Sequence, residues 1–158
     1  MATKQKITYG SWKSPITTEL ILNNGVGLGE ITLFNGDVYW IEMRPQEKGR
    51  YVIVKKAVAG QVSDLIPQQY NARTRVHEYG GGSYLVFSEG VVFCNFNDQN
   101  LYLVRHDNSV IQLTDNDDYR YADMVYDEKR RRIICIREDH SNKTLEPVIC
   151  PLDFILKL

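Results

Sequence analysis

The sequence has no long apolar run and few cysteines. No stretch approaches the roughly 18 apolar residues of a transmembrane helix, and the first ten residues lack the apolar core of a secretory signal. We therefore expect a cytoplasmic protein with no membrane partner. The three cysteines, Cys94, Cys135 and Cys150, are odd in number and widely spaced. We interpret them as reduced core thiols, and expect neither a disulfide framework nor a zinc site.

An excess of charge of one sign is also lacking. The 158 residues carry a formal net charge of -1, so the chain has no overall positive field for nucleic acid, and we expect no nucleic-acid partner. The one basic run, Lys129 to Arg132, lies between two strand-like segments and is interpreted as a solvated turn. The length and the 43% hydrophobic content are typical of one globular domain with a sizeable core.

Motifs for nucleophilic and zinc catalysis are incomplete. The sequence contains no G-x-S-x-G nucleophile elbow, and GGSYL at residues 81–85 breaks that pattern. His77 and Glu78 begin like a zinc-binding H-E-x-x-H helix, but Gly81 occupies the place of the second histidine. We therefore expect no catalytic residue and no metal site.

Cofactor and calcium motifs are incomplete as well. The glycines of Gly25 to Gly29 precede a strand, whereas a dinucleotide-binding loop follows one. Asp115 to Asp118 lacks the glycine and glutamate of a calcium loop and is interpreted as a turn between blades. His106 and His140 fall in expected turns and are predicted to face solvent. We expect no cofactor.

Short strands dominate what is present. Residues rich in Val, Ile, Tyr and Phe alternate with polar residues and are separated by turns such as Asn35-Gly36-Asp37. One short helix is expected near Thr17 to Leu22. The expected strands are Gly29–Phe34, Val38–Met43, Tyr51–Lys56, Gln61–Ile66, Ser83–Phe87, Val91–Phe96, Leu101–Arg105, Val110–Leu113, Met124–Tyr126, Arg132–Arg137 and Leu145–Cys150.

These strands recur as four-stranded units. The second strands of successive units, represented by Tyr39, Val92 and Ile134, are separated by 53 and then 42 residues, close to the period of propeller blades. We predict an all-β fold, a partial β-propeller of about three four-stranded antiparallel blades with the last incomplete. Residues 1–27 form an N-terminal extension with the short helix, and residues 28–158 form blades of about 28–68, 76–115 and 119–158.

About three blades cannot close a propeller, which takes four to eight. Either the chain is part of something longer, or copies associate to cover the open edges, or it folds as a smaller twisted stack of sheets. Homo-oligomers are expected.

Four segments carry a resemblance to a known family. They are GSWKSPIT at residues 10–17, VYWIEMRP at 38–45, YNARTRVHEYGGGSY at 70–84 and YRYADMVYDEKRRRIICIREDH at 119–140. In this order they resemble landmarks of acylaminoacyl peptidase and dipeptidyl aminopeptidase-like enzymes, which are serine peptidases of the prolyl oligopeptidase family. Residues 123–137 also resemble the repeat of TolB-like propellers, which like WD40 propellers have four-stranded blades.

The resemblance implies an N-terminal propeller that caps an α/β-hydrolase domain and limits access to its active site. The family's catalytic Ser, Asp and His lie in that hydrolase domain, so none is assigned in this chain, which we interpret as a truncated relative or a fragment. Its function would be to gate peptide substrates for a hydrolase domain supplied separately. The alternative is a stand-alone binding or scaffolding module that self-associates.

Two segments are candidate contact sites. The first contains Arg73, Arg75, His77, Glu78 and Tyr79, beside three glycines. These residues either tie one blade to the next, or they line the central channel or the face toward the hydrolase domain, where Arg73, Arg75 or Glu78 would meet a peptide terminus.

The second candidate segment contains Trp12, Pro15 and Ile16. It is an apolar strip that the resemblance would place near the hydrolase domain.

Overall fold

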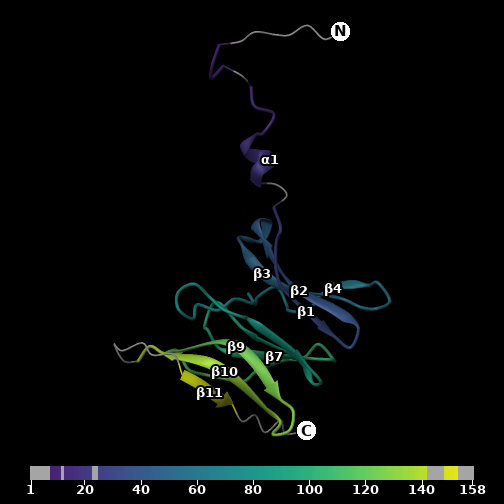
Figure 1. Ribbon diagram of the computed structural model, residues 1–158, viewed down its shortest axis with the longest axis vertical. Coiled ribbons are helices and arrows are strands. Elements are labelled where there is room, and N and C mark those ends of the chain that lie inside the picture. The colour runs from purple at the N-terminus through teal and green to yellow at the C-terminus, as the bar shows by residue number, and fades with distance from the viewer. Residues whose placement is uncertain (1–7, 12, 23–24, 142–147, 153–158) are drawn as a thin grey trace.

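The computed structural model describes residues 8–11, 13–22, 25–141 and 148–152. Within them the chain forms three antiparallel sheets that follow one another in chain order (Figure 1). The first sheet contains β1 (Gly27–Phe34), β2 (Asp37–Arg44), β3 (Arg50–Lys56) and β4 (Val62–Asp64). The second contains β5 (Tyr84–Phe87), β6 (Gly90–Cys94), β7 (Leu101–Arg105) and β8 (Val110–Gln112), and the third β9 (Tyr119–Asp127), β10 (Arg132–Asp139) and β11 (Val148–Leu152).

Short turns connect the strands of the first two sheets, and connect β9 to β10 in the third. The β1–β2 turn uses Asn35 and Gly36, both with positive φ (51° and 84°). This is the backbone that the favoured two-residue hairpin turns require, and Asn-Gly adopts it readily. A 3-10 turn, η1 (Pro45–Glu47), links β2 to β3. The strands of each sheet are therefore neighbours in both sequence and space.

The predicted fold class is confirmed: the chain is an all-β partial propeller, with two four-stranded sheets and one three-stranded sheet in its described part. Most strands lie within a residue or two of their predicted ends. The largest difference is at β9, which begins at Tyr119, five residues before the expected strand, and β11 begins at Val148, three residues after its predicted start. The boundaries for the extension and the blades remain predictions.

Two apolar layers hold the three sheets together. The first lies between the first two sheets and includes Tyr39, Ile41, Ile53, Val86, Val91, Phe93 and Val104. The second lies between the second and third sheets and includes Phe87, Val92, Leu101, Leu103, Met124, Ile133 and Cys135. The middle sheet is covered on both faces, so its strand β6 is buried throughout. Burial also raises the pKa of the Cys94 thiol to about 12, which keeps this thiol protonated and unreactive.

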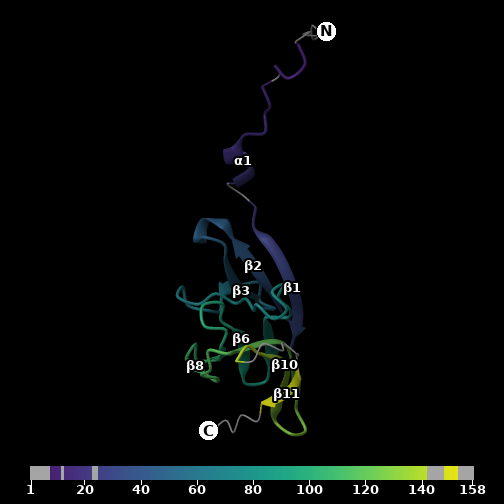
Figure 2. The same cartoon turned by 90° about the vertical axis from the view of Figure 1, so that its left-hand side faces the viewer.

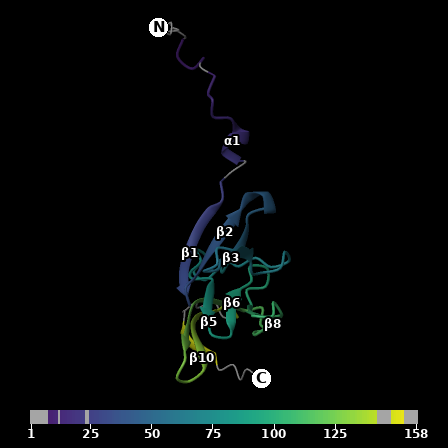
Figure 3. The same ribbon diagram turned by 90° about the vertical axis from the view of Figure 1, so that its right-hand side faces the viewer.

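The N-terminal segment lies away from the sheets. Its helix, α1 (Thr18–Leu22), begins after Thr17, whose Oγ1 accepts the N–H of Leu20 at 3.1 Å. Figures 2 and 3 show α1 separated from the sheets in two further views. None of the helices in the described part of the chain is long and apolar enough to span a membrane.

Candidate functional site

The segment Asn71–Val76 is wedged between the first two sheets. The N–H of Ala72 donates to the carbonyl oxygen of Tyr51 in β3, and that of Arg73 donates to the carbonyl oxygen of Cys94 in β6. Burial alternates along the segment, because Ala72, Thr74 and Val76 are buried and Arg73 is exposed. The segment therefore behaves like a strand whose arginines emerge at the junction of the sheets.

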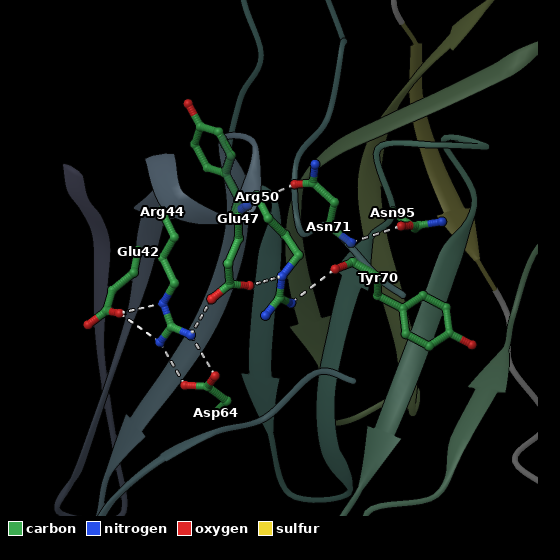
Figure 4. Close-up of polar contacts among 9 residues, drawn as sticks. Glu42, Arg44, Glu47, Arg50, Asp64, Tyr70, Asn71 and Asn95 are labelled. Carbon is green, nitrogen blue, oxygen red and sulfur yellow. Dashed lines mark hydrogen bonds and ion pairs between the residues drawn. The ribbon is translucent and has the colours of Figure 1, made fainter. Parts of the chain in front are cut away.

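A polar network anchors the start of this segment to the first sheet (Figure 4). Arg50 donates to the carbonyl oxygen of Tyr70 at 3.2 Å and, from Nε, to Glu47 at 2.5 Å. The side-chain oxygen of Asn71 accepts the N–H of Tyr51 at 3.0 Å, and the Asn71 N–H donates to Asn95 in the second sheet at 3.1 Å. These contacts fix the direction in which the connecting segment leaves the first sheet.

Arg44 forms the centre of the same network. Its guanidinium contacts the carboxylates of Glu42 at 2.7 Å, Glu47 at 3.2 Å and Asp64 at 2.6 Å. The hydrogen bonds to Asp64, with those to the other two carboxylates, raise the pKa of Arg44 above its ordinary value. Arg44 also lowers the pKa of Asp64. With every donor used, this group joins β2 to β4 and is not available to a ligand.

Two arginines stack on one aromatic ring beside the network. The guanidinium carbons of Arg73 and Arg75 each lie 5.1 Å from the centre of the Phe96 ring, and that of Arg73 lies 5.1 Å from the Tyr51 ring. Arg73 is exposed, and within the described residues it forms no ion pair. Stacking holds a guanidinium in place while leaving its edge open to a carboxylate.

The following turn reaches across to the third sheet. His77 and Glu78 have positive φ (55° and 60°), which turns the chain sharply. The buried carboxylate of Glu138 in β10 accepts the N–H of His77 at 2.7 Å and lies 3.0 Å from its Nδ1. Arg120 in β9 pairs with Glu78, whose pKa is lowered by that hydrogen bond. Tyr79 points into solvent, with 96% of its surface exposed.

The glycines after the turn allow a close approach to β9. A β-carbon on Gly82 would lie 3.0 Å from the carboxylate of Asp123, and one on Gly81 would lie 3.0 Å from the Ala122 side chain. Instead, the Gly82 N–H donates to that carboxylate at 2.7 Å, and its carbonyl oxygen accepts the Asp123 N–H at 2.9 Å. These two glycines are needed for space, whereas Gly80 also has a positive φ of 92°.

A second carboxylate holds the same loop from the first sheet. Glu30 occupies a bulge in β1 with a φ of 50°, and its carboxylate accepts the N–H and hydroxyl of buried Ser83 at 2.7 and 3.0 Å. Tyr84 donates its hydroxyl to the carbonyl oxygen of Glu30. Although the residue is exposed overall, burial of its carboxylate raises the pKa of Glu30, and the nearby charge of Asp123 adds to this.

The structure thus brings together four of the five predicted contact residues at the junction of the three sheets, with Tyr79 projecting from it. The predicted domain-interface strip lies elsewhere: Trp12 is outside the described residues, and Pro15 and Ile16 are exposed. No group of His, Cys, Asp or Glu in the described residues is arranged to hold a metal ion.

Comparison with solved structures gives close matches. A puromycin-hydrolyzing peptidase of Mycobacterium tuberculosis superposes with a TM-score of 0.83 and 32% identity, over 96% of this chain and 24% of that chain. A puromycin hydrolase superposes with a TM-score of 0.80 and 26% identity, over 94% of this chain and 25% of that one. The chain therefore spans about a quarter of each. No protein-family model and no curated protein sequence matches it.

Proposed function

We propose that the chain is the N-terminal β-propeller region of a peptidase of the prolyl oligopeptidase family. It would be the non-catalytic part of such a peptidase and would admit peptides to a separate hydrolase domain. The observation that carries the proposal is the match along 96% of the chain at 32% identity. The sequence itself contains no nucleophile elbow. Binding and access would be its contribution, and bond cleavage that of the hydrolase domain.

The stacked arginines are the best candidates for a peptide contact. Arg73 presents an exposed guanidinium on a rigid aromatic support, and a peptide carboxylate pairs well with such a group. The polar ties of this segment to all three sheets would hold it at a fixed position. We therefore assign Arg73, supported by Phe96 and Tyr51, the role of contacting the peptide's carboxyl group.

The proposed role can be tested with a chimera. The purified chain should not hydrolyse puromycin or aminoacyl chromogenic substrates, because catalysis would come from the hydrolase domain. When the chain replaces the matching quarter of the M. tuberculosis peptidase, the chimera should hydrolyse puromycin, and Arg73→Gln should alter KM for peptides more than kcat. Turnover by the chain alone that a serine-directed reagent abolishes would refute the proposal, as would a folded but inactive chimera.

A second candidate function, self-association, is favoured by the open face of the first sheet. Leu28, Ile31 and Leu33 of β1 are 70%, 73% and 73% exposed. With Val38 and Trp40 of β2, Leu28 and Ile31 line a shallow hollow of about 160 Å³. An exposed apolar sheet face of this kind is typical of an interaction site, and a second copy could cover it.

Light scattering tests this candidate. The wild-type chain should form dimers or larger species, and Leu33→Glu should shift it to monomers, because a charge on the covered face would lose its hydration. Val58→Glu is the matched control, since Val58 is 75% exposed and lies on the β3–β4 loop outside the hollow. A wild-type chain that stays monomeric at high concentration would contradict self-association.

A further inference from the structure

A groove lies between the first two sheets, at the end where their hairpin turns gather. A hollow of about 200 Å³ is lined by residues of both sheets, including Tyr39, Lys55, Val86 and Val91. A second, shallower hollow of about 500 Å³ adjoins it, because Arg105 and His106 line both. None of the residues of the junction described above lines either hollow.

The groove has an apolar floor. Tyr39, Val86, Val91 and Val104 are each less than 9% exposed, yet all of them line the first hollow. They belong to facing strands of the two sheets, so an apolar group placed there would contact both sheets at once. The floor favours a ligand with an apolar body.

Of the two cations at the rim, Lys55 is held in an ion pair in the described part of the chain and Arg105 is not. Lys55 pairs with Asp37 at 2.7 Å, so its charge is compensated. The half-buried Arg105 forms no ion pair within the described residues. The Asp107 carboxylate accepts the hydroxyl and N–H of Ser109 at 2.6 and 2.9 Å, and these hydrogen bonds lower the pKa of Asp107. The Arg105 charge is near enough to contribute to this lowering, but Arg105 and Asp107 form no ion pair. The Arg105 guanidinium therefore has the capacity to bind an anion at the mouth of the groove.

His106 extends the polar side of the mouth. Its Nε2 lies 2.9 Å from the carbonyl oxygen of Ser88. Because a carbonyl only accepts, Nε2 carries the proton and donates it, which ties the ring to the β5–β6 turn. The imidazole thus forms a wall beside Arg105, between the two hollows.

We propose that this groove binds a small carboxylate that carries an apolar body. The carboxylate would pair with Arg105 in the two-point geometry that a guanidinium favours, and the apolar body would rest on the floor between the sheets. A volume of about 200 Å³ is below the roughly 300–1,000 Å³ of sites for drug-sized ligands. The ligand is therefore of the size of an aryl or short aliphatic acid. This site goes beyond the proposed function and does not depend on it.

Titration of the isotope-labelled chain with phenylacetate, followed by NMR, tests the proposal. We expect saturable shifts confined to the amides near residues 55, 86–91 and 104–108. The neutral analogue 2-phenylethanol and inorganic phosphate should each bind at least tenfold more weakly. The first lacks the carboxylate that would pair with Arg105, and the second lacks the apolar body. Equal binding of either probe, or shifts centred elsewhere, would overturn the assignment.

Substitutions test the role of the guanidinium. Arg105→Gln should weaken phenylacetate binding at least tenfold, and Arg105→Lys should weaken it less, because the charge remains while the two-point geometry is lost. Arg130→Gln is the control, since Arg130 is exposed on the β9–β10 turn and pairs only with Asp127. Dispersed spectra will show that each variant is folded. Unchanged affinity in Arg105→Gln would refute the proposal, as would an absence of saturable binding to the wild-type chain.

Discussion

Replacing Gly90 by alanine is expected to lower the free energy of unfolding by about 2–6 kcal/mol, a large part of the stability of an ordinary domain. Gly90 begins β6 with a φ of 144°, and such backbone strain costs alanine about 1–3 kcal/mol. In addition, a β-carbon would lie 2.1 Å from the carbonyl oxygen of Val104. Relief of that overlap costs about a further 1–3 kcal/mol.

The neighbouring backbone cannot move aside easily. Gly90 pairs with Arg105, and Val91 pairs with Val104, so a shift of β7 would break the pairing at the centre of the middle sheet. That sheet is the one packed on both faces. The strain would therefore spread into both apolar layers.

Substitutions at two other glycines distinguish the cost of backbone strain from the cost of steric overlap. Gly60 has a φ of 91° but no atom within 4 Å of an added β-carbon, so Gly60→Ala should cost only about 1 kcal/mol. Gly29 lacks both features, and Gly29→Ala should change stability little. Urea unfolding curves will give the free energies of unfolding of the three variants and hence their order of stability. Equal losses of unfolding free energy for Gly90→Ala and Gly60→Ala would contradict the prediction, because they would mean that β7 shifts away from the added β-carbon at little cost.

The strands could be predicted because their side chains alternate and their turns carry marker residues. Val38–Met43 was expected and β2 runs from Asp37 to Arg44, one residue longer at each end. The start of β9 was missed for a physical reason. Asp123 occupies a bulge, where its φ is 53° and the pairing with β10 shifts. A bulge interrupts the alternation that identifies a strand, so only the residues after it resemble one.

The sequence predicted the residues of the connecting segment at the junction but not the residues of the third sheet that they contact. Arg73, His77 and Glu78 stand out because they lie beside three glycines. Their partners do not: Glu138 is 61 residues from His77, and Asp123 is 41 residues from Gly82. Acidic residues in a strand ordinarily face solvent, and no local pattern indicates that these two contact the distant turn and glycines.

The prediction for His140 was wrong for the same reason. It was expected to face solvent, but its side chain is only 21% exposed and pairs with Glu138 at 3.1 Å. The residue follows β10 directly, so its position in the sequence resembles a turn. Its partner Glu138 is only two residues away, but that carboxylate is buried against the turn at His77, which is 61 residues away in the sequence. Only the folded chain brings those groups together.

Replacing Glu138 by alanine is expected to cost about 2–4 kcal/mol of stability and to release the turn at His77. The carboxylate is 5% exposed, accepts the His77 N–H at 2.7 Å and lies against His77 and His140. Its removal leaves the N–H in a partly buried position without its acceptor, which costs about 1–3 kcal/mol. Loss of the contacts to the two imidazoles and of packing adds to this.

Hydrogen exchange can separate this local effect from general loss of stability. In Glu138→Ala the amides of residues 76–82 should exchange faster than those of β6, because the anchor of the turn is lost while the middle sheet remains packed. Glu138→Gln should restore part of the protection, since its amide oxygen still accepts the His77 N–H. Glu89→Ala is the control: Glu89 forms a single ion pair with Arg131 at 3.5 Å at the surface, and such pairs contribute about 0–1 kcal/mol. Uniform acceleration in Glu138→Ala would instead mean that the turn and all three sheets unfold as one unit. In that case the junction would be a structural tie whose exposed arginines cannot move independently of the sheets.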